Sequence, residues 1–108
     1  FDTLQSAGGN TVMLATSLFA DGTVFHYDIF DARGRSVVPE EYLGAAGHSV
    51  LIGQRGEFAH VHALPAPVTA RDPSPKFFVP ALPQGTYRVF TQFKLNGVVT
   101  TWDFDWEA

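Results

Sequence analysis

The chain has 108 residues, of which 45% are hydrophobic and 17% charged, a composition typical of one folded domain with a substantial core. Its net charge of −4 and its seven scattered lysines and arginines argue against a nucleic-acid partner, which would require a basic patch. The chain lacks cysteine, which excludes disulfides, thiolate catalysis and blue-copper sites, and it has no apolar run long enough to insert into a membrane.

We therefore predict a single domain over residues 1–108, with 1–10 as an N-terminal linker or edge segment that includes a loop at 6–10. Because the chain begins at Phe1, we expect that its start has been cut away, and the upstream sequence could hold a signal, an anchor or another domain. Alternation predicts strands at 11–19 and 23–30. In the second strand Phe25, Tyr27 and Ile29 form the apolar face, which places His26 and Asp28 on the other face.

The middle of the chain is less regular. Residues 39–44 are compatible with one helical turn that begins near Pro39 and ends at Gly44. A β-hairpin is predicted over 48–62, with a three-residue loop that ends at Gly56, a residue suited to the left-handed conformation required there. A proline-rich excursion at 65–75 precedes a short strand at 76–82.

The closing segment carries the clearest structural signal. Asn96-Gly97 is the preferred pair for a two-residue hairpin turn, and it joins strands at 86–95 and 98–107. The turn sets a register in which apolar residues share one face, so we predict that this face is core. Its members are Tyr87, Val89, Phe93, Trp102, Phe104 and Trp106.

These elements predict an all-β protein, an immunoglobulin-like or cupredoxin-like antiparallel β-sandwich of about seven strands. The segment Gln84-Gly85-Thr86-Tyr87 is typical of a tyrosine corner, in which the tyrosine hydroxyl bonds to a backbone group a few residues upstream.

Three of the four histidines lie in the predicted hairpin. His60 and His62 share a strand face, and the predicted loop places His48 opposite His62. Neutral imidazole suits copper, zinc and nickel, so we predict a metal site at His48, His60 and His62, with copper favoured over zinc. The alternative is that these histidines only hydrogen-bond the loops at the hairpin edge.

Other polar residues give weaker signals. His26 with Asp28 could form a further ligand pair, although two solvated positions explain them as well. Glu40 and Glu41 could supply a fourth ligand or orient an imidazole, or form an acidic helix start. Catalysis is poorly supported, because Ser49 and His48 are strand neighbours and point to opposite faces.

Two motifs resemble those of a family of bacterial secreted or membrane-anchored β-sandwich domains, mostly of unassigned function. They are Tyr-Leu-Gly-x-x-Gly-His at 42–48 and His-Val-His at 60–62, and the resemblance extends to the strand from Gly85 to Phe90. It implies an extracytoplasmic location and, more weakly, a metal role, with matching positions at Tyr42, Gly44, Gly47, His48, His60 and His62. The family usually has proline where this chain has Ala63, a departure expected to loosen the strand end.

Three functions therefore remain open. The first is a periplasmic, secreted or surface-anchored metal-binding module for copper or zinc in metal acquisition, delivery or sensing. The second is an immunoglobulin-like structural or interaction module that contacts a protein partner or an upstream domain without metal. The third is a small metal-dependent enzyme, which would require a substrate pocket that the sequence does not demonstrate. We favour the first function and expect no enzymatic activity.

Overall fold

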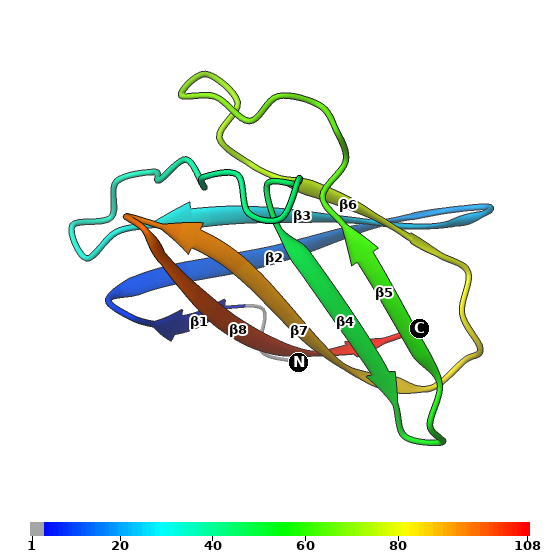
Figure 1. Ribbon diagram of the computed structural model, residues 1–108. Helices are drawn as coiled ribbons and strands as arrows, with labels where there is room; N and C mark the ends of the chain where they lie inside the picture. The colour runs from blue at the N-terminus through cyan, green and yellow to red at the C-terminus, as the bar shows by residue number, and fades with distance from the viewer. Residues whose placement is uncertain (1–3) are drawn as a thin grey trace.

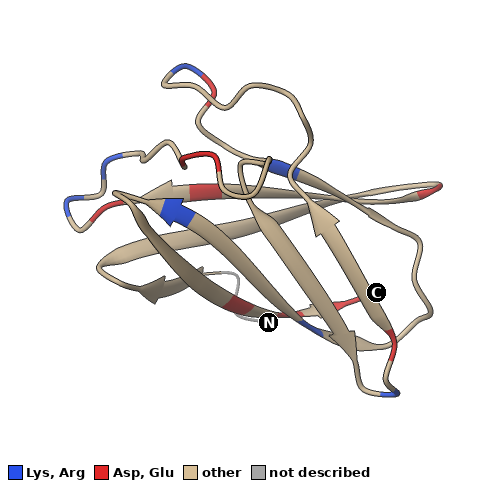
Figure 2. Ribbon diagram, in the orientation of Figure 1, with Lys and Arg blue, Asp and Glu red and all other residues tan. Residues whose placement is uncertain are grey.

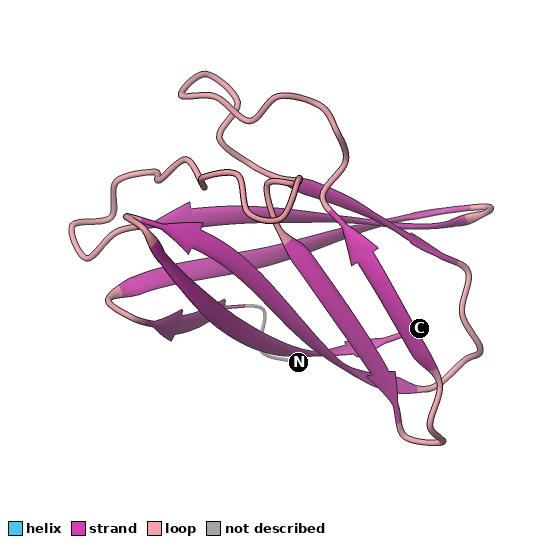
Figure 3. Cartoon of the chain, viewed as in Figure 1, coloured by secondary structure: helices cyan, strands magenta, loops and turns pink. Residues whose placement is uncertain are grey.

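The computed structural model describes residues 4–108 as eight strands in two four-stranded antiparallel sheets that pack face to face (Figures 1 and 3). One sheet has the order β1-β2-β3-β6 and the other β5-β4-β7-β8. No helix occurs within these residues. The predicted all-β sandwich is confirmed. The strands are β1 (Leu4–Ala7), β2 (Asn10–Phe19), β3 (Gly22–Phe30), β4 (His48–Gly53), β5 (Phe58–His62), β6 (Lys76–Pro80), β7 (Thr86–Leu95) and β8 (Val98–Glu107).

The beginning of the described chain differs from the prediction. The loop expected at 6–10 is instead a hairpin, in which β1 pairs with β2 and adds an eighth strand. Gly8 and Gly9 connect the two strands with φ angles of 60° and 80°, which glycine adopts without steric cost. In the sequence, the glycine pair therefore indicates a tight turn between two strands and not a longer loop. Residues 1–3 of the predicted N-terminal segment lie outside the described residues.

The core lies between the two sheets, and seven of its 15 buried residues are aromatic. The closing hairpin has the predicted register, from Leu95 opposite Val98 to Tyr87 opposite Trp106. Asn96 and Gly97 both have positive φ, as the two-residue turn requires. Five of the six predicted core residues are at most 1% exposed, and Trp106 packs against them from the margin. The opposite sheet supplies Phe25, Tyr27 and Phe77, which are fully buried.

A small polar network joins the two sheets inside this core. The Tyr27 hydroxyl lies 2.7 Å from Thr91 Oγ1, which lies 3.0 Å from Ser49 Oγ. Burial raises the pKa of Tyr27 above its ordinary value, so the phenol stays neutral. No buried side-chain nitrogen or oxygen within residues 4–108 lacks a hydrogen-bond partner. Ser49 therefore serves the core, on the opposite face of β4 from His48.

The predicted tyrosine corner is present at the start of β7. The Tyr87 hydroxyl donates to the Pro83 carbonyl at 2.8 Å. This bond fixes the connection that brings the chain from β6 in one sheet to β7 in the other.

The segment between β3 and β4 corrects a second prediction. Residues 39–44 do not form a helical turn: the Glu40 amide donates to the Lys94 carbonyl at 2.8 Å, in an extended bridge along the end of β7. The Glu40 carboxylate accepts the Gly97 amide at 3.0 Å, so it caps the closing hairpin. A tight turn follows from Tyr42 to Ala45, with Leu43 and Gly44 at φ 53° and 83°. Tertiary partners thus replace the local helical hydrogen bonds.

Charged residues are dispersed over the molecule. Figure 2 shows lysines and arginines on separate loops and strand ends of residues 4–108. On the outer face of the second sheet, Arg88 pairs with Asp103 and, at 2.7 Å, with Asp105. Within the described residues we find no helix of the length and apolarity needed to cross a bilayer.

Candidate metal centre

The β4–β5 hairpin positions the three histidines on the outer face of their sheet. The Gly53 amide donates to the Glu57 carbonyl at 2.8 Å, and Gly56 has a φ of 89°, so the predicted three-residue loop is confirmed. As a result His48 pairs with His62 and Val50 with His60. Figure 1 shows the start of β4 beside the end of β5, at the same end of the sheet as the long connection to β6.

The three imidazoles converge. Ring centroids are 4.6 Å apart for His48 and His62, 4.8 Å for His60 and His62, and 6.1 Å for His48 and His60. One nitrogen from each ring lies within 4.8 Å of the other two, and within residues 4–108 no other trio of histidine or acidic side chains meets this condition. The predicted grouping of these side chains is therefore present in the structure.

His48 is the anchored member of the trio. Its side chain is 8% exposed, whereas His60 and His62 are exposed. Nε2 of His48 lies 2.6 Å from the Tyr42 carbonyl oxygen. Because a carbonyl only accepts hydrogen bonds, Nε2 carries the proton, and Nδ1 of the neutral ring keeps the lone pair. This is the arrangement that metal-ligating histidines use to set the tautomer and ring orientation.

The backbone around His48 explains two glycines of the first motif. Gly44 holds the left-handed position of the turn whose first carbonyl, that of Tyr42, accepts from His48. A Cβ on Gly47 would lie 2.6 Å from the ring of Phe93, a contact that real side chains do not make. Gly47 therefore lets the chain pass against the core immediately before His48.

Ala63 corrects a further expectation, because the strand end is not loosened there. The Ala63 amide donates to the Gly47 carbonyl at 3.0 Å, and the residue is 7% exposed. Proline has no amide proton and could not make this bond. The alanine thus adds a hydrogen bond directly after His62.

The electrostatics of the cluster favour a neutral His62 imidazole. Partial desolvation lowers the pKa of His62 below its ordinary value, and the neighbouring His48 and His60 rings lower it further. A neutral ring keeps the lone pair that a metal ion needs. At a given pH, the neutral fraction of His62, which is the form that can bind a metal, is therefore larger than that of an isolated histidine.

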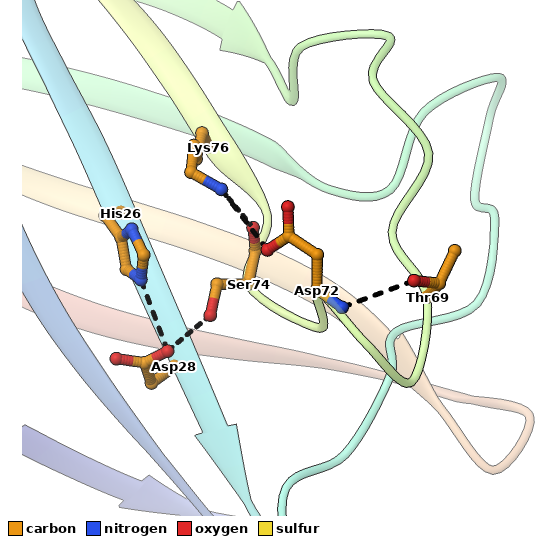
Figure 4. A network of polar contacts seen from close by, with 6 residues as sticks. All are labelled: His26, Asp28, Thr69, Asp72, Ser74 and Lys76. Carbon is orange, nitrogen blue, oxygen red and sulfur yellow. Dashed lines mark hydrogen bonds and ion pairs between the residues drawn. The ribbon is translucent and has the colours of Figure 1, made fainter.

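The other predicted candidates lie elsewhere. His26 contacts Asp28 at 3.3 Å on the outer face of the opposite sheet. Figure 4 shows these two in a chain of polar contacts with Ser74, which donates to Asp28, and with the loop before β6. Glu40 is engaged by Gly97, so it does not complete the histidine cluster. Glu41 is not part of the histidine cluster, although it lines a separate hollow together with His62.

The sequence prediction missed the residues that surround the histidines. A hollow of about 430 Å³ lies against them. Its other walls are Leu43, Val50, Phe90, Gln92 and Thr101. The signal was available in part, since the β7–β8 register places Gln92 opposite Thr101 on the outer face. The pairing of β4 with β7, which joins these residues to the histidines, depends on the tertiary structure.

Small side-chain rotations would bring three imidazole nitrogens at these distances to the spacing of roughly 3.3 Å that ligands of a tetrahedral ion have, with the fourth position left open. The fold and the cluster together define an antiparallel β-sandwich with a three-histidine site on one outer sheet face. The chain belongs to the family described as Domain of unknown function (DUF8832), whose model matches residues 5–108.

The fold is similar to that of a solved structure. A crystal structure of a DUF4426 family protein from Pseudomonas aeruginosa PAO1 superposes with a TM-score of 0.76, over 99% of this chain and 96% of that chain. The two sequences are 11% identical, so the likeness concerns the fold alone. No functionally curated protein matches this sequence.

Proposed function

We propose that this protein is a metal-binding module that holds one divalent ion at His48, His60 and His62. The observation that carries this proposal is the convergence of three imidazole nitrogens within 4.8 Å of one another. The Tyr42 carbonyl adds support, because it orients His48 with Nδ1 free.

Copper is the favoured ion. For a given set of nitrogen ligands, Cu(II) binds more tightly than Zn(II) or Ni(II). The module acts in metal acquisition, delivery or sensing outside the cytoplasm. The extracytoplasmic setting rests on the resemblance of the two histidine motifs to those of secreted and membrane-anchored domains.

The proposal is tested by titrating tag-free, metal-stripped protein with Cu(II) and Zn(II), and by measuring the melting temperature with and without metal. At a free metal concentration 100 times Kd, binding to the native state adds about 2.7 kcal/mol. For a domain of this size we expect the melting temperature to rise by roughly 10 °C. The His60→Ala/His62→Ala variant should lose this rise.

The matched control is His26→Ala, which removes the one histidine outside the cluster. It should bind metal with wild-type stoichiometry and affinity. An equal temperature shift in wild type and in His60→Ala/His62→Ala, or no shift in either, would overturn the metal proposal.

A second candidate function is a metal-free interaction module, and exposed apolar residues favour it. Leu18 and Phe19 at the β2–β3 turn are 85% and 55% exposed. They line a hollow of about 350 Å³ that also includes Trp106. If metal binding fails, this end of the sandwich is the surface to test for a protein partner.

A further inference from the structure

The residues that line the hollow beside the histidines are arranged in cross-strand rows, which the strand register sets. One cross-strand row runs from His62 through His48 and Gln92 to Thr101. The next row runs from His60 through Val50 and Phe90 to Asp103. The floor of the hollow therefore begins at the imidazoles and continues as an apolar strip formed by Val50 and Phe90. The amide of Gln92 and the hydroxyl of Thr101 lie beside this strip. Its volume of about 430 Å³ lies in the range of small-molecule sites.

No carboxylate lines this hollow among the described residues. Asp103, at the end of the second row, is already paired with Arg88. Glu40 is bonded to the Gly97 amide. A divalent ion on three neutral imidazoles would thus keep its full double charge and an open position facing the hollow. An anionic oxygen ligand complements both properties.

The strip beside the open metal position is apolar and accessible to solvent. Val50 and Phe90 are half-buried, and Leu43 at the rim is 74% exposed. On the far side, Gln92 Nε2 donates to Thr101 Oγ1 at 3.2 Å. This bond uses one of the two amide protons of Gln92. A ligand longer than the metal position itself can extend along Val50 and Phe90.

We propose that the metal-loaded protein binds an organic monocarboxylate with an apolar body. The carboxylate takes the open metal position and the body covers Val50 and Phe90. This inference rests on the proposed metal-binding function and goes beyond it by assigning the ligand of the fourth position. An acetate ion fills only the metal position, whereas a longer carboxylate also covers the apolar strip.

The test uses full-length, tag-free protein loaded with Co(II), whose visible absorption changes when an anion enters the coordination sphere. Cobalt binding is measured first. Acetate, butyrate and hexanoate are then titrated at saturating cobalt in a non-coordinating buffer. With each methylene half-buried and worth roughly twofold in affinity, hexanoate should bind at least about tenfold more tightly than acetate.

Two variants probe the strip. Phe90→Ala should bring hexanoate close to acetate in affinity, and Val50→Thr should weaken hexanoate several-fold while it preserves side-chain shape and strand preference. Phe58→Ala is the matched control, because Phe58 is 65% exposed on the same sheet but lies outside the hollow. It should retain the wild-type preference for hexanoate.

The outcomes separate the two proposals. Cobalt binding with no spectral response to carboxylates, or with equal affinity for acetate and hexanoate, would overturn this inference and leave the metal site standing. A preference for hexanoate that survives both Phe90→Ala and Val50→Thr would also overturn it. If only Cu(II) binds, the same carboxylate titrations are read from its visible absorption. Failure of Co(II), Cu(II) and Zn(II) alike to bind would overturn the metal site, and this inference with it.

Discussion

At the scale of single residues, the two faces of β4 separate structure from chemistry. His48 on the outer face donates to the Tyr42 carbonyl and groups with His60 and His62. Ser49, the next residue, is 1% exposed and joins Tyr27 and Thr91 in the core. The two side chains point apart because successive strand residues alternate between faces. One strand thus supplies both a candidate ligand and a buried hydroxyl.

Thr91 is the central residue of the buried hydroxyl network. Thr91→Val keeps the side-chain shape but leaves the Tyr27 and Ser49 hydroxyls without this partner. We expect the free energy of unfolding to fall by about 2 kcal/mol, the usual cost of unpaired buried polar groups. Urea unfolding measures this loss. The control Thr16→Val, at an exposed position, should change stability by less than about 0.5 kcal/mol.

Gly47 links the core to the histidine cluster. Gly47→Ala would place a methyl group 2.6 Å from the buried ring of Phe93. We expect a loss of about 1–3 kcal/mol in thermal or urea unfolding, because a packed aromatic ring cannot give way cheaply. A second substitution, Phe93→Leu, makes room beside the new methyl group. The double variant should therefore lose less than the sum of the two single losses, and strict additivity would contradict the clash.

At the scale of elements, the β4–β5 hairpin depends on its loop for register. Gly56 holds the left-handed position, and Glu57 folds back so that Oε1 accepts the Arg55 amide at 3.0 Å. A shift of one residue in this loop would move His48 away from His62 across the pleat. The loop therefore sets the geometry of the histidines from the far end of the hairpin.

Glu57 should make this hairpin sensitive to acid. Hydrogen bonds from its own amide and from the Arg55 amide hold the pKa of Glu57 below its ordinary value of 4.5. A lowered folded-state pKa contributes stability that is present above about pH 4.5 and is lost as the pH falls through the folded-state value.

The Glu57→Gln variant cannot ionise and therefore lacks this contribution. Its melting temperature should lie below that of the wild type near neutral pH, and the gap should narrow as the pH falls below about 4.5. Melting temperatures of both proteins measured across that range check this expectation. A gap that stays constant with pH would contradict it.

At the scale of the whole molecule, long-range ties attach the irregular segments to the sandwich. Glu40 fastens the β3–β4 connection to the closing hairpin through Gly97. Asp28 fastens the proline-rich segment before β6 through Ser74, and Lys76 reaches back to Asp72 at 3.5 Å (Figure 4). The Glu40 and Asp28 ties join residues that are distant in sequence, whereas the Lys76–Asp72 pair is local. The two long-range ties therefore attach the irregular segments to the sandwich.

Removing the Asp28 tie should loosen the long segment without unfolding the sheets. In Asp28→Ala, Ser74 and His26 both lose their shared acceptor. With roughly 1 kcal/mol less local stabilisation, we expect cleavage within residues 64–75 by a nonspecific protease to be about fivefold faster. The control Asp21→Ala changes an exposed aspartate in the β2–β3 turn and should keep the wild-type cleavage rate. Equal rates for both variants would contradict the tie.

Much of the fold and part of the site could be predicted from the sequence, because both depend on local chemistry. Asn96-Gly97 and Gly56 require left-handed backbone, so each determines a hairpin register and, through it, which side chains share a face. This pairs Tyr87 with Trp106 and His48 with His62. The Gly8-Gly9 hairpin was missed because short polar strands next to glycines carry no hydrophobic alternation.

The remainder was decided by the tertiary structure. Three features depend on how β4 pairs with β7 and on how the chain crosses between the sheets. They are the bond from His48 to the Tyr42 carbonyl, the Glu40 cap on Gly97 and the hollow along Val50 and Phe90. No local sequence pattern indicates which segments these contacts will bring together. By itself the sequence determined seven of the eight described strands, the registers of the β4–β5 and β7–β8 hairpins and the three candidate ligands, since alternation and turn stereochemistry act over a few residues. The surroundings of those ligands were decided only when the two sheets packed together.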